Sequence, residues 1–151
     1  MEILRDKTKV SGYWTFTYSD GTVKTEKNLI TQSGLNAMAA LFIGEIPADS
    51  TIYLAMGTGT VAAITGDSAL GTEGFRKILT SKTRNLNEVR LRFFMMSSEG
   101  VGNWSEAGVF IAGTAQSGSG QLLNRILPTG GISKASNQVM TIEVRIPFTA
   151  G

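Results

Sequence analysis

Alternating apolar and polar residues near the start of the chain predict a β-hairpin over residues 9–28. One face of its first strand carries large apolar side chains, namely Val10, Trp14, Phe16 and Tyr18. The segment Ser19-Asp20-Gly21 supplies a turn, and residues 22–27 return as the second strand. This pattern is typical of strands that bury one face.

A period of 3.6 residues then replaces the alternation and predicts a helix within residues 29–44. Its apolar stripe consists of Leu35, Met38, Ala39 and Phe42. Thr31 or Ser33 can cap the start of this helix, and Gly44 can end it. No later segment keeps this period for ten residues, so we expect no second helix of that length.

From residue 50 onward, short strand-like segments alternate with turn signals and predict a β core over residues 50–148. The segments cover residues 51–56, 76–82, 89–96, 104–112, 121–127 and 138–148. Odd-numbered residues of 89–96 form an apolar face, so Phe94 and Met96 on the other face need cover from the helix, a loop or another subunit. Pro147 lacks an N–H and favours a sheet edge for the end of the last strand.

These elements together predict a single domain over residues 1–151 that is mainly β. Residues 1–8 form an N-terminal arm before the hairpin. We expect an antiparallel β-sandwich or small barrel with one helix packed on it.

The residue types that the chain lacks exclude several classes of catalytic and metal site. The chain of 151 residues contains neither histidine nor cysteine, so it has no imidazole base, no thiolate and no disulfide. Ser-His-Asp and Cys-His catalysis are thereby excluded, together with most transition-metal sites. No closely spaced set of acidic residues suggests calcium either. We expect no enzyme activity, no catalytic residues, no cofactor and no metal.

Charge and hydropathy bear on partners and location. Fourteen basic and 12 acidic residues are scattered along the chain, so no basic stripe indicates nucleic acid binding. No apolar run is long enough for a membrane span, and the start has no apolar core of a signal peptide. We expect synthesis in the cytoplasm and no membrane partner. An apolar fraction of 42% beside 17% charged residues favours surfaces that are hidden against other proteins.

The segment "YLAMGTGTVAAITGDSALGTEGFRK", residues 53–77, raises the question of a nucleotide site. A phosphate-binding loop needs Lys-Ser or Lys-Thr directly after its glycines, and a dinucleotide site needs Gly-x-Gly-x-x-Gly at the start of a helix. The segment has neither, so we expect its glycines to permit tight turns with positive φ. Val61 and Ile64 either contact a neighbouring subunit or pack on their own domain.

Four acidic residues stand out as candidates for chemistry: Asp67, Glu73, Glu99 and Glu106. Glu99 and Glu106, with Trp104, are the candidates for a carbohydrate-cleaving or carbohydrate-binding site. We favour a structural role instead. A carboxylate entering a core region needs a cation or N–H groups, and Arg76 or Arg125 can serve Glu106. Glu73 lies three residues before Arg76 and can pair with it if the turn is helical.

Several motifs occur in an order that resembles the small β-rich structural virion proteins of tailed bacteriophages. They are "KNLITQSGLNAMAALF", "IYLAMGTGT", "SALGTEGFRKIL", "EGVGNWSEAGVFI", "GQLLNRILP" and "SKASNQVMTIEVRIPF". The resemblance covers about residues 28–148 and extends more distantly to the N-terminal attachment domains of tail fibres. It implies that Glu73, Arg76 and Glu106 are framework residues.

The resemblance implies a structural virion protein associated with the tail, baseplate or fibres. A head decoration protein is the alternative, and a carbohydrate-binding module that recognises a host surface glycan is a second one. We expect self-assembly, as a homotrimer, and contacts with other virion proteins. Candidate interface residues are Val61, Ile64, Phe94 and Met96, and the expected structural charge network is Glu73, Arg76, Glu106 and Arg125.

Overall fold

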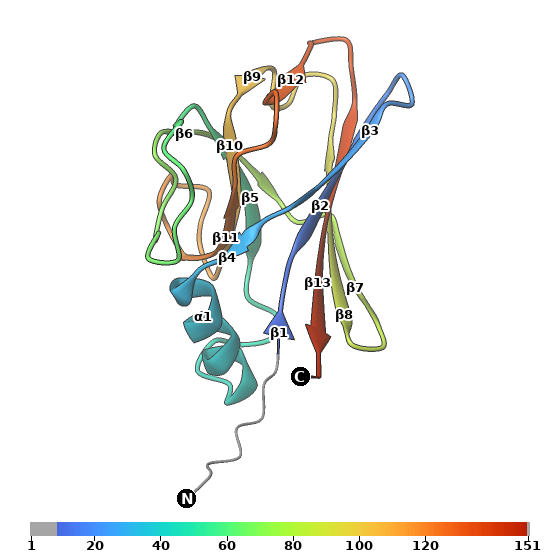
Figure 1. The fold of residues 1–151 in the computed structure, drawn as a ribbon. Coiled ribbons are helices and arrows are strands. Elements are labelled where there is room, and N and C mark those ends of the chain that lie inside the picture. Colours follow the sequence, from blue (N-terminus) through green and yellow to red (C-terminus); the bar gives the residue numbers. More distant parts are fainter. Residues whose placement is uncertain (1–8, 151) are drawn as a thin grey trace, which may run out of the picture.

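The computed structural model describes residues 9–150, and the expected N-terminal arm at residues 1–8 lies outside them. Two antiparallel sheets face each other and form a sandwich, with one helix at its lower end in Figure 1. The fold is therefore mainly β, as the alternating pattern predicts. One apolar core lies between the sheets and takes side chains from both, including Trp14, Phe93, Leu54 and Val109.

The first sheet has the order β3 (Val23–Lys27), β2 (Tyr13–Tyr18), β13 (Met140–Thr149), β8 (Glu88–Met95) and β7 (Ser81–Asn85). The short β1 (Lys9–Val10) pairs with the end of β13. Even-numbered residues of β2 and β13 and odd-numbered residues of β8 face the core. The predicted N-terminal hairpin is present as the antiparallel pair β2 and β3.

The second sheet has the order β4 (Leu29–Ile30), β11 (Gln121–Ile126), β10 (Glu106–Ile111), β5 (Ile52–Gly57) and β6 (Glu73–Ile78). A separate ribbon pairs β9 (Gly102–Trp104) with β12 (Ile132–Lys134). The prediction of one strand over residues 76–82 is wrong, because β6 ends at Ile78 and β7, which belongs to the other sheet, begins at Ser81. The chain changes sheets there, which hydropathy alone does not reveal.

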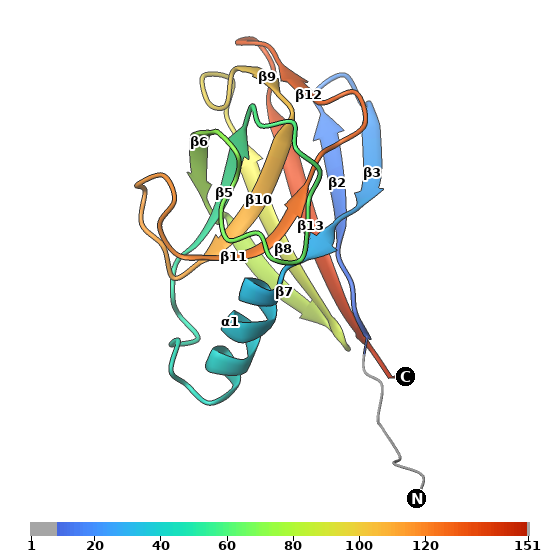
Figure 2. The ribbon, with the colours of Figure 1, turned by 60° about the vertical axis from the view of Figure 1, so that its left-hand side comes forward.

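Loops cover the outer side of the second sheet. Figure 2 shows the loop of residues 58–72, drawn in green, crossing in front of β10 and β11, with the loop of residues 112–120 beside it. Beneath these loops lies a second small apolar cluster, formed by Ala55, Leu70, Phe110 and Leu122. Strand β10 is consequently buried on both faces.

Helix α1 (Gln32–Phe42) begins after Thr31, one of the two caps that the sequence offered, but it buries a different face from the predicted one. The side chain of Thr31 caps the helix by accepting a hydrogen bond from the N–H of Gly34. Gly34 and Ala37 are the buried helix residues, whereas Leu35 and Phe42 of the predicted stripe are exposed. The reason is close approach: a side chain at Gly34 would collide with the main chain of Leu123 on β11. Residues 29 and 30 of the predicted helical range form β4 instead.

Pro147 does not mark a sheet edge, because β13 lies between β2 and β8. The pairing of β13 with β2 stops at Arg145 and resumes with β1 at Phe148. Pro147 is therefore next to a break in its neighbour, where a missing N–H costs no ladder hydrogen bond.

Candidate functional site

Glu106 lies at the centre of the charged cluster that the glycine-rich loop encloses. Its neighbours Ala107 and Val109 on β10 face the main core, so alternation turns Glu106 to the outer side of the sheet. The loop of residues 58–72 covers it there, and the side chain has no exposed surface. The N–H groups of Gly59, Gly71 and Thr72 donate hydrogen bonds of 2.9, 2.9 and 2.7 Å to its carboxylate.

Arg125 on β11 neutralises this carboxylate from the side. Its Nε and Nη2 donate to Oε2 of Glu106 at 3.1 and 2.8 Å. The same guanidinium holds the loop through Asp67, at 3.0 Å, and through the carbonyl of Val61, at 2.8 Å. Of the two cations that the sequence offered to Glu106, the structure selects Arg125, because β11 adjoins β10.

The glycines around this cluster are needed for space rather than for unusual backbone angles. A Cβ at Gly57 or Gly59 would lie 2.6 or 2.5 Å from Oε1 of Glu106. None of the glycines between residues 57 and 74 has a positive φ, so the turn explanation predicted for them is wrong. The loop does bind an anion with its N–H groups, as a nucleotide loop would, but that anion is the protein's own Glu106.

Burial and hydrogen bonding act in opposite directions on Glu106. Burial alone raises the pKa of a carboxyl group, since it disfavours the charged form. The hydrogen bonds from Thr72, Gly71, Arg125 and Gly59 outweigh burial and hold the pKa of Glu106 below its usual value. Glu106 is therefore ionised at neutral pH, and it is too well neutralised to act as a base.

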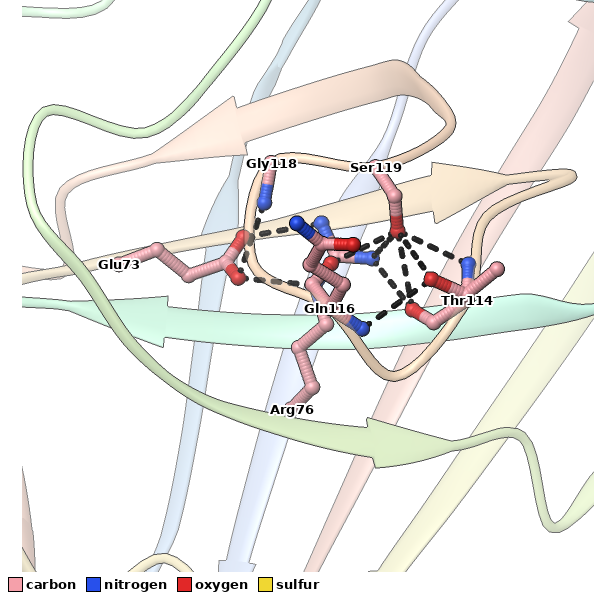
Figure 3. A network of polar contacts seen from close by, with 6 residues as sticks. All are labelled: Glu73, Arg76, Thr114, Gln116, Gly118 and Ser119. Atoms are coloured by element: carbon pink, nitrogen blue, oxygen red, sulfur yellow. Dashed lines mark hydrogen bonds and ion pairs between the residues drawn. The ribbon is translucent and has the colours of Figure 1, made fainter.

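Glu73 and Arg76 on β6 form a second network, shown in Figure 3. The Nε and Nη2 atoms of Arg76 donate to the two oxygens of Glu73 at 2.8 and 3.0 Å. The sequence allowed this pair only in a helical turn, yet it forms on a strand. The register of β6 against β5 shifts between Met56 and Gly57, and such a bulge brings residues three apart to one side.

The second network fastens the loop of residues 112–120 over the sheet. Nη1 of Arg76 donates to the carbonyl of Thr114 and to Oγ of Ser119. Oε2 of Glu73 accepts from the N–H of Gly118. The guanidinium also lies 4.3 Å from the centroid of the buried Phe110 ring, a cation–π arrangement. Glu73 and Arg76 thus hold the second loop as Glu106 and Arg125 hold the first.

Lys134 was missed by the sequence reasoning. It is almost fully buried on β12, and its Nζ donates to the carbonyls of Met96 and Ser97. Burial lowers the pKa of Lys134. Nearby, Glu99 pairs with Lys77 at 2.7 Å, and hydrogen bonds from Lys77 and the N–H of Met96 lower the pKa of Glu99. A short polar strand such as "ISK" gives no hydropathy signal for a buried lysine.

The four acidic residues singled out in the sequence are all engaged in ion pairs. Asp67 and Glu106 share Arg125, Glu73 pairs with Arg76, and Glu99 pairs with Lys77. This arrangement does not suit carbohydrate cleavage, which needs an accessible carboxyl group.

Trp104, the aromatic residue of the carbohydrate hypothesis, packs within the fold. Its ring packs near Phe75, with ring centroids 6.4 Å apart, and its Nε1 donates to the carbonyl of Gly100. Gly74 lies against the same ring, because a Cβ there would be 2.8 Å from it. Among residues 9–150, no cluster of three acidic side chains is placed to hold a metal ion.

Apolar side chains at the surface form the remaining candidate site. Val61, Ile64, Phe94 and Met96, the predicted interface residues, are all exposed. The helix does not cover Phe94 or Met96, since it packs on β11 of the other sheet. Exposed apolar residues that the sequence reasoning did not single out include Ile43 and Leu86.

An apolar groove of about 410 Å³ opens beside the end of α1. Its apolar lining includes Leu41, Ile52, Leu91 and Ile111. The lining also includes two cations of the edge strand β7, Lys82 and Arg84. Nζ of Lys82 donates to the carbonyl of Ala48, so this cation links the edge strand to the segment that follows the helix. Inward-pointing cations of this kind also discourage pairing at a sheet edge.

Comparisons with protein-family models, curated proteins and solved structures find no match to this chain. No helix within residues 9–150 has the length and apolar character needed to cross a membrane.

Proposed function

We propose that this chain is a structural component of a tailed-phage virion, associated with the tail, baseplate or fibres, and that it works through contacts with other proteins. The observation that carries the proposal is the contrast between its charged and apolar residues. The candidate acids are neutralised within the fold, while Val61, Ile64 and Met96 are left at the surface. Covering such apolar side chains with a partner is favourable, because it removes their surface from water.

The ordered motifs that resemble phage virion proteins give the proposal its biological setting. Five of the motifs contribute to helix α1, to the covered second sheet and to the loop that binds Glu106, whereas the last motif contains β13 of the first sheet. Two loops fastened by buried ion pairs make a rigid outer surface, as repeated assembly into one particle requires. Self-assembly as a homotrimer through Val61, Ile64, Phe94 and Met96 is part of the proposal.

Particle labelling tests the virion role. An antibody raised against the purified chain should label the tails of phage particles from the lysate that contains it, as seen by negative-stain electron microscopy. Recovery of the chain only in the soluble fraction, after the particles have been pelleted, would contradict the proposal.

Head decoration is the alternative, and the copy number separates it from a tail role. A decoration protein covers the capsid in hundreds of copies, whereas a tail or fibre component is present in a few tens at most. Quantitative densitometry of purified virions against the major capsid protein measures this number. A carbohydrate-binding role would show as glycan-array binding that Trp104→Ala abolishes.

A further inference from the structure

The edge strand β7 carries two cations on the core side of its sheet. In the pairing of β7 with β8, Lys82 lies opposite Leu91 and Arg84 lies opposite Val89. Residues directly opposite each other on two strands share one side of the sheet, and this side of β8 faces the core. Lys82 and Arg84 therefore occupy positions at which a strand that buries one face would carry apolar side chains.

The protein does not neutralise either of these cations. Nζ of Lys82 donates to the carbonyl of Ala48 at 2.9 Å, and Nη1 of Arg84 donates to the carbonyl of Leu86 at 2.7 Å. Among residues 9–150, no carboxylate forms an ion pair with either of them. Both residues are exposed and keep unused N–H donors, because an ammonium and a guanidinium carry several each. Two positive charges are thus available to an anion beside the apolar groove.

The groove next to these cations has the size of a ligand site. Its volume of about 410 Å³ falls within the range of roughly 300–1,000 Å³ that small-molecule sites occupy. Leu91 and Ile111 of its lining belong to the main core, and Leu41 and Ile52 pack against that core. Inward-pointing cations are sufficient to discourage pairing at the edge strand, but they do not account for an apolar groove that no side chain fills.

We propose that this groove binds a medium-chain fatty acid. The alkyl chain lies along the apolar lining, and Lys82 and Arg84 bind the carboxylate at the mouth of the groove. Charge complementarity selects an anionic head group, because the described residues of the lining include two cations and no acid. An apolar lining with a few polar groups that orient the ligand is the usual form of a small-molecule site. The proposal concerns the isolated chain and does not depend on a virion role.

A peptide segment suits this groove less well than an alkyl chain. Each peptide unit brings an N–H and a carbonyl group, and these need hydrogen-bond partners when they are buried. Apart from the two cations, the polar residues that line the groove within the described part of the chain are Ser50 and Thr83. An alkyl chain needs no such partners, so it can fill the groove without leaving polar groups unpaired.

Isothermal titration calorimetry of the whole chain with octanoate, decanoate and dodecanoate, each below its micelle concentration, provides the first measurement. We expect one ligand per chain and an affinity that rises about fourfold for each added CH₂ group until the groove is full. Decanol has the same chain length as decanoate but no charge, so it should bind about tenfold more weakly.

Lys82→Gln and Arg84→Gln test the contact with the head group. Each should weaken the binding of decanoate about tenfold and leave the binding of decanol nearly unchanged, because only a charged head group needs the cation. Arg90→Gln is the matched control and should keep both affinities. Arg90 lies on the adjacent strand β8, opposite Thr83, on the outer side of the sheet. Circular dichroism checks that each variant is folded.

Ala48→Trp tests the apolar part of the site. Ala48 is an exposed residue of the lining, so a large side chain there should fill the groove and abolish the binding of decanoate and decanol alike. The proposal is overturned if dodecanoate does not bind at about 1 mM, or if decanoate and decanol bind equally well. Equal losses in Lys82→Gln and Arg90→Gln would also overturn it. Binding to phosphatidylglycerol vesicles without binding of free dodecanoate would indicate a membrane surface as the partner instead, and would overturn it too.

Discussion

Arg125 donates two hydrogen bonds to the same oxygen of Glu106, at 2.8 and 3.1 Å, and both side chains are almost completely buried. This pair joins β10 to β11 on the side of the sheet away from the main core. The remaining hydrogen bonds of both residues reach the glycine-rich loop, through Gly59, Gly71 and Asp67. One ion pair therefore determines the position of a loop of about 15 residues.

Replacing Glu106 should destabilise the fold strongly. Glu106→Gln keeps the shape but turns an amide N–H₂ toward groups that are themselves donors, so we expect a loss of about 2–4 kcal/mol in the free energy of unfolding. Urea denaturation measures this loss. Glu45→Gln, at an exposed position, is the control and should change stability by less than about 0.5 kcal/mol. An unchanged stability of Glu106→Gln would show that the pair is not a structural element.

The same residue should make stability depend on pH in acid. The folded pKa of Glu106 is lowered, whereas an unfolded Glu titrates near about 4.3. Its contribution is therefore present above about pH 5 and is lost as the pH falls through the lower, folded pKa. We expect the difference in unfolding free energy between wild type and Glu106→Gln to be constant from neutral pH to about pH 5 and to shrink below it. A difference that persists undiminished to about pH 3 would contradict the lowered pKa.

Gly59 should be intolerant of even a methyl group. A Cβ there would lie 2.5 Å from Oε1 of Glu106, so Gly59→Ala must displace either the carboxylate or the loop. We expect a loss of about 1–3 kcal/mol, measured by thermal denaturation. Gly66 lies in the same loop with open space around it and no positive φ, so Gly66→Ala should be neutral or slightly stabilising. Equal effects of the two substitutions would argue against the close approach.

Arg76→Lys should loosen the second loop while preserving the charge. Lysine cannot reproduce the planar fork that binds Glu73, nor the stacking of the guanidinium on Phe110. We expect a loss of about 2 kcal/mol and faster amide hydrogen exchange at Gly118 and Ser119. Arg92→Lys, in an exposed ion pair, is the matched control and should cost less than about 1 kcal/mol. Slow exchange in the Arg76 variant would mean that the loop is held by other contacts.

The sequence was sufficient to predict the strands that have one apolar and one polar face. The alternation over residues 13–18 and 140–146 places side chains in the core as predicted, because a strand with one apolar face can be buried in only one way. Thr31 and Gly44 delimit the helix as predicted, since capping depends on local backbone geometry.

Features that depend on what lies opposite in space could not be predicted in this way. The helix exposes Leu35 and buries Gly34, because only a glycine fits against the main chain of Leu123. The sequence pattern shows which residues are apolar, but it does not show how closely a neighbouring strand approaches. The position of Pro147 in a central strand has a similar explanation. Pro147 lies beside the gap between β1 and β2, and that gap is a feature of the tertiary structure.

The charged cluster around Glu106 could likewise be predicted only in part. By itself the sequence determined that this chain has neither imidazole nor thiol, that it forms short antiparallel strands with one helix, and that Glu106 enters a buried region and needs a counterion. Only the tertiary structure decided that the counterion is Arg125, that the glycine-rich loop binds Glu106 rather than a nucleotide, and that Leu35 and Phe42 of α1 are exposed. The physical reason is that alternation and capping are local properties, whereas ion pairing and close packing depend on which strands become neighbours.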